Sequence, residues 1–197
     1  ATNSITFFIN HFKSKFPGIP PTNTPDPAAW LREKIIEDNA KRLRQSTEVL
    51  RIIKNRFNGN LFNTKDFIVM GDLNEYAGAE PVAPLWHNSN LEDVFQRITK
   101  PEDRWTHYWD AKGKVAQLDH ILVSPSITAK TNGVKPLIER RAIGFRGKSA
   151  TNGFLPRKVK YESMEDDPNP IQLDFQFPRF DGITDKVNAS DHCPVFF

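Results

Sequence analysis

Apolar and polar side chains alternate in the first segment of the chain, ITFFINHFKSK. A repeat of two residues is typical of a β-strand, so the segment is predicted to form a strand that ends near His11 and Lys13. The two alternating sets are Ile5, Phe7 and Ile9 on one side and Thr6, Phe8 and Asn10 on the other. The proline-rich connector that follows, FPGIPPTNTPDP, fits neither a central strand nor the inside of a helix.

The next segment has a helical repeat of apolar residues and a clear start signal. Asp26 is suited to cap a helix, and Pro27 is suited to its first position. The sequence NGN at residues 58–60 is predicted to end the helix. We expect the charged side chains to form a solvated outer face. The apolar positions are Trp30, Ile36, Ala40, Leu43, Leu50, Ile53 and Phe57.

A continuous apolar run, DFIVM, follows the helix and predicts a strand buried on both faces. Asp72 and Asn74 come just after it. A strand, a long helix and a second buried strand favour the α/β class, in which ligands bind beyond strand ends. The sequence therefore indicates that Asp72 and Asn74 are candidate functional residues.

The second half of the chain gives weaker signals. LEDVF predicts a short helix or turn, RWTHYW a strand, and AQLDHILVS a strand with Asp119 inside an apolar run. A buried carboxylate needs a partner, unless this is an edge strand with Asp119 facing water. Residues 132–188 are expected to form an irregular surface excursion, and the ending NASDHCPVFF places Asp191 and His192 before a last strand. We expect a single domain over residues 1–197.

Composition narrows the class of protein only slightly. A formal charge of +3 and a pI near 9.0 permit an anionic partner without requiring one. Cys193 is the single cysteine, so no intrachain disulfide can form, and no Cys and His spacing indicates a zinc site. Neither a membrane span nor a signal peptide is visible.

The polar residues at the predicted strand ends together suit phosphodiester hydrolysis. Attack of water on an anionic diester needs charge neutralisation, a positioned nucleophile and protonation of the leaving oxygen. Asp72 and Asp191 suit a hard divalent cation such as Mg²⁺ or Mn²⁺. His192 is a candidate base, and Asp119 can accept a hydrogen bond from its other ring nitrogen. His11 is left as an acid or a phosphate ligand, and no role is assigned to His87 or His107.

Three blocks, in this order, resemble the signature of the endonuclease/exonuclease/phosphatase superfamily: GDLN at residues 71–74, LDHILVS at 118–124 and SDHCPV at 190–195. This is the metal-dependent fold of deoxyribonuclease I, AP endonucleases, neutral sphingomyelinases and inositol polyphosphate phosphatases. The block NHFKSK at residues 10–15 is similar to the extracellular nuclease-like group. The resemblance implies a four-layered α/β sandwich, incomplete in this chain, in which two mixed or mainly antiparallel sheets pack face to face between helices.

The resemblance also implies roles for individual residues. Lys13, Trp105 and Thr106 are expected to contact substrate, and His120 is expected to be non-catalytic. The cofactor is expected to be Mg²⁺, with Mn²⁺ or Ca²⁺ as alternatives, and a secreted location is implied. The expected catalytic residues are His11, Asp72, Asn74, Asp119 and His192, and the expected metal ligands are Asp72 and Asp191.

One departure from the family pattern shapes the functional hypothesis. The family has an early Asn and a metal-binding Glu upstream of the NHFKSK strand, and Glu33, Glu37 and Glu48 on the predicted helix cannot replace that Glu. We therefore expect residues 1–197 to be the C-terminal half to two-thirds of the domain, and to need an N-terminal partner segment. The leading hypothesis is a nuclease. The alternatives are a sphingomyelinase-like enzyme acting on phospholipid, and a non-catalytic remnant that binds a partner.

Overall fold

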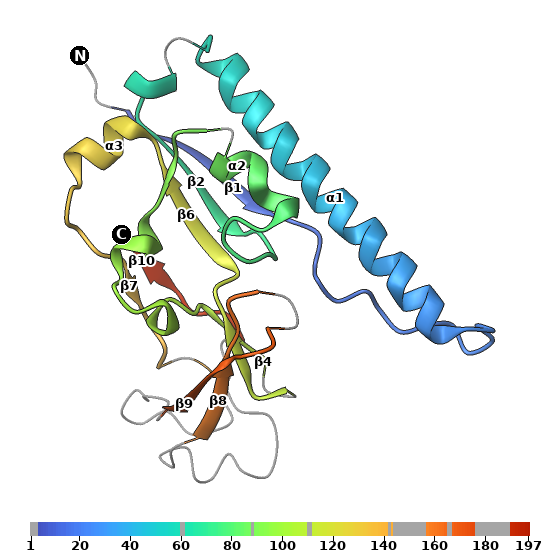
Figure 1. Ribbon diagram of the computed structural model, residues 1–197. Helices are drawn as coiled ribbons and strands as arrows, with labels where there is room; N and C mark the ends of the chain where they lie inside the picture. The colour runs from blue at the N-terminus through green and yellow to red at the C-terminus, as the bar shows by residue number, and fades with distance from the viewer. Residues whose placement is uncertain are drawn as a thin grey trace. The chain divides into compact units, whose positions relative to one another are not determined.

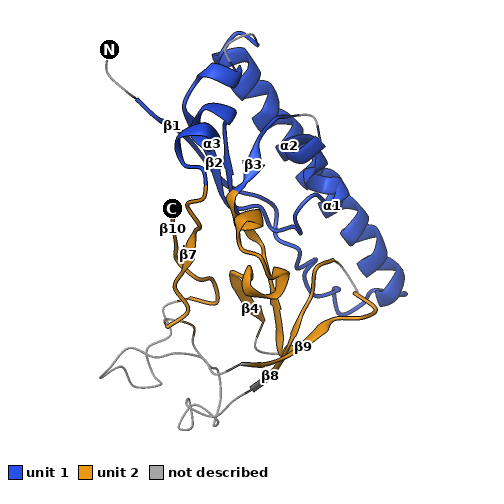
Figure 2. Ribbon diagram, turned by 60° about the vertical axis from the view of Figure 1, so that its left-hand side comes forward, with its two compact units in different colours: residues 1–93, 120–132 blue, residues 94–119, 133–197 orange. Residues whose placement is uncertain are grey.

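The computed structural model describes residues 4–59, 62–87, 89–109, 112–141, 143, 157–164, 167–175 and 190–197. The chain divides into two compact units, which Figure 2 colours separately. Unit 1 comprises Ala1–Asp93 and His120–Asn132, and unit 2 comprises Val94–Asp119 and Gly133–Phe197.

Unit 1 is built on a mixed sheet with the strand order β1-β2-β6-β3. Strands β1 (Thr6–His11) and β2 (Phe67–Asp72) are parallel, and their register sets His11 opposite Asp72. Strand β3 (Glu92–Asp93) pairs antiparallel with β6 (Asp119–Val123). The Ser124 amide donates to the carbonyl of Phe67 over 3.1 Å, so β6 runs antiparallel to β2. Two strand ends predicted to carry functional side chains, those of β1 and β2, are therefore neighbours.

Helix α1 (Pro27–Arg56) connects β1 to β2 and runs alongside them in Figure 1. Its start is as predicted, because the Asp26 carboxylate accepts a hydrogen bond of 2.9 Å from the Ala29 amide and Pro27 occupies the first helical position. The end of the helix, at Arg56, also agrees with the expected stop. The strand, helix and strand arrangement is confirmed.

The inner face of α1 differs from the prediction over its first half. Trp30 and Leu43 are only partly buried, and Ile36 is 68% exposed. The buried positions follow one helical stripe: Asp38, Arg42, Ser46, Leu50 and Ile53. The stripe changes from polar to apolar along the helix, because its first half faces the polar segment after β1 and its second half faces the core. The expectation that the charged residues form only a solvated face is wrong for Asp38 and Arg42.

The core of unit 1 lies between α1 and one face of the sheet. The rings of Phe57 and Phe67 stack with their centroids 5.1 Å apart, and Phe8 meets both edge-on. Phe8 therefore points inward, whereas Ile5, Phe7 and Ile9 are exposed. The strand was predicted correctly, but its apolar set of alternate residues is the outward one. Unit 1 also contains two short α-helices, α2 (Ala83–His87) and α3 (Pro125–Lys130).

Unit 2 contains a four-stranded sheet with the order β4-β5-β8-β9. Its cluster of buried side chains includes Trp105, Tyr108 and Cys193. The strands are β4 (His107–Trp109), β5 (Lys114–Ala116), β8 (Arg157–Tyr161) and β9 (Ile171–Phe175). A two-stranded antiparallel sheet is formed by β7 (Leu137–Ile138) and β10 (Val195–Phe196). Short 3-10 helices lie at Phe62–Thr64, Glu80–Val82, Val94–Arg97 and Pro101–Asp103.

The described part of residues 132–188 is more regular than expected. Strands β8 and β9 pair antiparallel over five residues each, and β8 also pairs with β5. The charge blocks that suggested a surface loop are compatible with strands that expose one face. Residues 144–156 and 176–189 lie outside the described residues. Mixed and antiparallel sheets with helices confirm the α/β class. Among the described residues, no helix has the length and apolar character needed to span a membrane.

Gly71 allows β1 and β2 to approach at the end of the sheet. Its φ of +128° is in a region that favours glycine, and a Cβ atom there would lie 2.0 Å from the carbonyl oxygen of Asn10. Because that oxygen belongs to the backbone of the neighbouring strand, it cannot move aside without disturbing the pairing. Glycine in the GDLN block is therefore required by the close approach of the two strands.

We predict that Gly71→Ala lowers the free energy of unfolding by at least about 2 kcal/mol, through backbone strain and the clash with Asn10. Urea unfolding followed by circular dichroism measures the change. Gly59→Ala is the matched control, since Gly59 also has a positive φ but a Cβ atom there would meet no atom within 4 Å. Equal losses for the two variants would contradict the argument from close approach.

Candidate functional site

His11 and Asp72 form a pair at the ends of β1 and β2. The Nε2 atom of His11 lies 3.5 Å from Oδ2 of Asp72, and the side chains are 77% and 17% exposed. Parallel pairing puts the two residues in direct register. The backbone continues this contact, because the Phe12 amide donates to the carbonyl of Asp72 over 2.9 Å. The imidazole of His11 is thus accessible to solvent, whereas the carboxylate of Asp72 is largely enclosed.

Asn74 holds Asp72 through two hydrogen bonds of 2.8 Å, one from its backbone amide to Oδ1 and one from Nδ2 to Oδ2. Nδ2 also donates to the carbonyl of Phe12 over 3.2 Å. A side-chain amide has two N–H hydrogens, so both have acceptors here. In the structure Asn74 thus orients Asp72 and the segment after β1, and its expected catalytic role stays a prediction. Its φ of +50° suits this tight turn.

Next to this turn lies a buried network of charged side chains, formed by Arg42, Glu75 and Lys15, which the sequence analysis did not predict. Nε of Arg42 lies 3.2 Å from Oε2 of Glu75, and both side chains are almost fully buried. Nη1 of Arg42 donates to the carbonyls of Lys13 and Ser14 over 3.0 and 3.2 Å. Lys15 reaches the other oxygen of Glu75 at 2.7 Å. One guanidinium therefore ties α1 to the segments that follow β1 and β2. The sequence did contain one indication that Arg42 is buried, because its spacing from the apolar Leu50 puts both residues on the same face of the helix.

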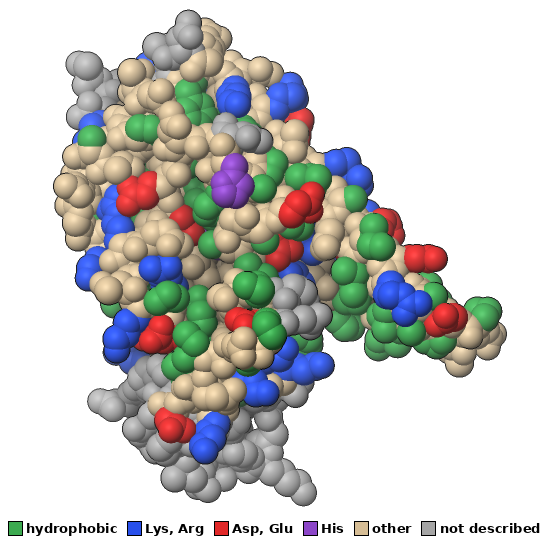
Figure 3. Space-filling model, viewed as in Figure 1, with side chains coloured by type: hydrophobic (Ala, Val, Ile, Leu, Met, Phe, Trp, Pro, Cys, Tyr) green, Lys and Arg blue, Asp and Glu red, His purple; other side chains and the backbone are tan. Residues whose placement is uncertain are grey.

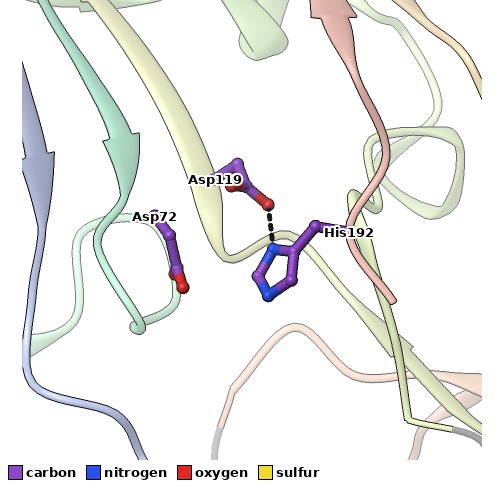
Figure 4. Close-up of side chains that lie close together, drawn as sticks. All are labelled: Asp72, Asp119 and His192. Carbon is purple, nitrogen blue, oxygen red and sulfur yellow. Dashed lines mark hydrogen bonds and ion pairs between the residues drawn. The ribbon is translucent and has the colours of Figure 1, made fainter. Parts of the chain in front are cut away.

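In unit 2, Asp119 and His192 form a hydrogen bond of 2.7 Å between Oδ2 and Nδ1, drawn as a dashed line in Figure 4. An ionised carboxylate only accepts, so Nδ1 is the donor and the neutral ring carries its lone pair on Nε2. The contact expected between these two residues is present. It also supplies the partner that a partly buried Asp119 needs.

Thr106 and Trp105 support this pair from within unit 2 and are not placed to contact substrate. The Thr106 hydroxyl is fully buried and accepts from the amides of Leu118 and Asp119 over 3.2 and 3.0 Å. Trp105 is fully buried, with the guanidinium of Arg140 4.3 Å above its ring. The predicted substrate contacts of both residues are therefore corrected: Thr106 holds the backbone of Asp119, and Trp105 fills the core.

His107 is a further candidate that sequence reasoning passed over. Its ring lies 4.8 Å from that of His192, and its Nε2 is 3.7 Å from the exposed carboxylate of Asp191. Burial and the neighbouring His192 lower the pKa of His107 below its usual value, although Asp191 and Asp119 oppose the shift. An isolated β-bridge pairs His107 with His192, which explains why residues far apart in sequence meet.

His120 and Cys193 are both buried. His120 is fully buried, with Nδ1 3.2 Å from Asp93 and Nε2 2.9 Å from the carbonyl of Glu75. Its expected lack of a catalytic role stays a prediction. Burial raises the pKa of the Cys193 thiol to about 12, so it is protonated at neutral pH.

The sequence profile of the Endonuclease/Exonuclease/phosphatase family matches residues 4–192. The chain belongs to this family. Members of the endonuclease/exonuclease/phosphatase family are mostly hydrolases that cleave phosphodiester or phosphate-ester bonds with a divalent metal. No match was found among curated proteins or among solved structures. The extracellular nuclease group, the secreted location and the need for an N-terminal partner segment stay predictions.

The donor chemistry of the described residues fits such a metal. Asp72 and Asp191 offer carboxylate oxygens, which are the ligands that Mg²⁺, Mn²⁺ and Ca²⁺ prefer. Asp72 is oriented by Asn74, as a ligating carboxylate normally is by a neighbouring group. Asp191 has a side chain that is 61% exposed and so is accessible to an ion from solvent. The predicted metal residues therefore suit a hard cation.

We predict that Arg42→Met lowers the free energy of unfolding by roughly 2–4 kcal/mol, because Glu75 and two backbone carbonyls lose a buried charged partner. Urea unfolding measures the loss. Arg51→Met is the matched control, since Arg51 pairs with Glu48 on the exposed side of the same helix and should unfold like the unmodified protein. A similar loss in both variants would show that the buried network has no special weight.

Acidification should weaken the fold through His107. Its pKa is lower in the folded protein than the value of about 6.5 in an unfolded chain, so below about pH 6.5 the unfolded chain binds more protons. The free energy of unfolding should therefore fall as pH drops from 7.5 to about 5.5. His107→Asn, measured alongside in chelator, should show a smaller fall. An identical pH dependence in the two proteins would exclude this role for His107.

Proposed function

We propose that the protein is a metal-dependent nuclease, which hydrolyses phosphodiester bonds of nucleic acid. Family membership supports hydrolysis of phosphodiester or phosphate-ester bonds. The hydrogen bond between Asp119 and His192 is the observation that supports proton transfer by His192. A carboxylate paired with the donor nitrogen of an imidazole is an arrangement that makes the other ring nitrogen an effective proton acceptor. The basic character of the chain, with a pI near 9.0, is compatible with a polyanionic substrate.

In the proposed reaction, Nε2 of His192 takes a proton from water as the water oxygen attacks phosphorus. The bond from phosphorus to the leaving oxygen breaks, and that oxygen gains a proton from His11 or from solvent. Asp119 keeps the His192 ring in the correct tautomer and stabilises the imidazolium that forms. Asn74 contributes by fixing Asp72, in line with its hydrogen bonds.

Asp72 and Asp191 are the proposed metal ligands. When bound, the metal supplies positive charge against the developing charge of the phosphate. The chain's own residues bind and orient the diester and move its protons. His107, next to Asp191, is proposed to hold that carboxylate in place.

We propose that hydrolysis of the diester requires both the residues at the ends of β1 and β2 and those of unit 2. A double-mutant comparison tests it. The loss of activity in Asp72→Asn combined with His192→Ala should be far smaller than the summed losses of the two single variants, expressed as activation free energies, because the effects of residues needed for the same step are not additive.

Activity measurements on plasmid DNA test the proposal as a whole. With Mg²⁺, His192→Ala and Asp119→Asn should each lower kcat by at least about a hundredfold, because proton transfer or the tautomer is lost. Chelation should abolish cleavage, and added Mg²⁺ should restore it. His87→Ala is the control, since His87 is an exposed histidine outside the proposed machinery.

The outcome also decides between the remaining hypotheses. Near-unchanged cleavage by His192→Ala would overturn the mechanism. Faster turnover of sphingomyelin than of DNA would favour the phospholipid alternative. A stably folded protein that hydrolyses no diester with any divalent metal would show that this chain is not a self-sufficient nuclease, as expected either of a non-catalytic remnant or of an enzyme that needs an N-terminal partner segment.

A further inference from the structure

A groove on unit 1 runs between the segment after β1 and helix α1. Its volume is about 540 Å³, and its lining includes His11, Lys13, Lys41, Arg44 and Gln45. Lys41, Arg44 and Gln45 are three and four residues apart, so they share one face of α1. Four basic side chains line the groove, and the lining contains no carboxylate. Its chemistry therefore suits an anion.

Two of these cations are paired with carboxylates of α1: Lys13 with the buried Asp38, and Lys41 mainly with the half-exposed Glu37, whose Oε1 lies 2.7 Å from its Nζ. Asp38 is 1% exposed, and its Oδ2 lies 3.0 Å from Nζ of Lys13 while its Oδ1 lies 3.7 Å from Nζ of Lys41. Burial opposes ionisation of Asp38, but the hydrogen bond and charge of Lys13 prevail and keep its pKa below the usual value. The two ammonium groups are thus held in place before any ligand binds, which lowers the entropy cost of binding.

The other side of the groove is equally well fixed. Oε1 of Gln45 accepts from the backbone amide of Lys13 over 2.9 Å, and Arg42 holds the carbonyls of Lys13 and Ser14. Arg44 is exposed and forms no ion pair with another described residue. Its guanidinium can therefore bind two oxygens of a phosphate without first breaking an internal contact.

The charge in the groove is local. On the face shown in Figure 3, basic and acidic side chains are interspersed, whereas the lining of the groove is basic without a carboxylate. His11 belongs to the groove and also lies 3.5 Å from Asp72. The groove is consequently adjacent to the residues proposed to act on the diester.

We infer that this groove binds a backbone phosphate next to the scissile one, so that the substrate is a nucleic-acid strand with consecutive phosphates. The inference rests on the proposed function, because it takes His11 and Asp72 as neighbours of the scissile phosphate. A phospholipid with one phosphodiester offers no second phosphate for the groove. Lys41 and Arg44 are therefore specificity residues, distinct from those that carry out the reaction.

The test compares Arg44→Gln and Lys41→Gln with Arg32→Gln, an exposed arginine of α1 outside the groove. A labelled single-stranded DNA is titrated in chelator at several salt concentrations. Each groove variant should raise Kd roughly five- to tenfold and reduce the salt slope by about 0.7, the value for one lost phosphate contact on a single strand. Arg32→Gln should change neither, and Arg44→Lys should keep the salt slope of the unmodified protein, because the charge is retained, while raising Kd, because the bidentate contact is lost.

Turnover of a small diester, bis(p-nitrophenyl) phosphate, separates this inference from the proposed function. The groove variants should hydrolyse it at the rate of the unmodified protein while their KM for DNA rises. If bis(p-nitrophenyl) phosphate is hydrolysed normally and Arg44→Gln binds DNA as tightly as Arg32→Gln, the inference that the groove binds a phosphate is wrong, while the proposed function stands. Absent hydrolysis with a selective loss of DNA binding would overturn the proposed enzyme and leave the groove as a binding site. Stronger, groove-dependent binding to phosphatidylserine vesicles than to DNA would overturn the nucleic-acid assignment. Unfolding curves confirm that each variant is folded.

Discussion

The buried guanidinium of Arg42 is the contact on which the geometry of unit 1 depends. It reaches Glu75 after β2 and the carbonyls of Lys13 and Ser14 after β1. The same two segments are also joined by the ion pair of Lys15 with Glu75 and by the hydrogen bond of Asn74 to the carbonyl of Phe12. A charge taken out of water is stable only when its donors are paired, so the network has one favourable arrangement. His11 and Asp72 are the last residues of β1 and β2, directly before the two segments that this network joins.

Much of the framework could be predicted from local signals in the sequence. Asp26 and Pro27 marked the start of α1, and the apolar run before Gly71 marked β2, because capping and burial act over a few residues. The pairing of Asp119 with His192 was also foreseeable, since a carboxylate inside an apolar run needs a partner. These features share one property: each is decided by chemistry that neighbouring residues already show.

The incorrect predictions concern contacts between residues that are far apart in the sequence. Phe8, and not Phe7 or Ile9, faces the core because α1 covers that side of the sheet, and alternation cannot say which face a helix will cover. Asp38 and Arg42 looked like surface charges until the segment after β1 supplied their partners. Thr106 and Trp105 were assigned to substrate, whereas strand pairing with distant residues buries them. His107 was missed for the same reason, as its contact with His192 joins residues 85 positions apart.

The environment of Cys193 gives the protein a built-in reporter. It is the single cysteine of the chain, it is buried in the cluster of unit 2, and its thiol is protonated in the folded state. A thiol reagent can therefore modify it only when that part of the chain opens. Since unit 1 has no cysteine, the labelling rate in native buffer measures the opening of unit 2 alone. Comparison with global unfolding would show whether the two units lose their structure in one cooperative step or separately.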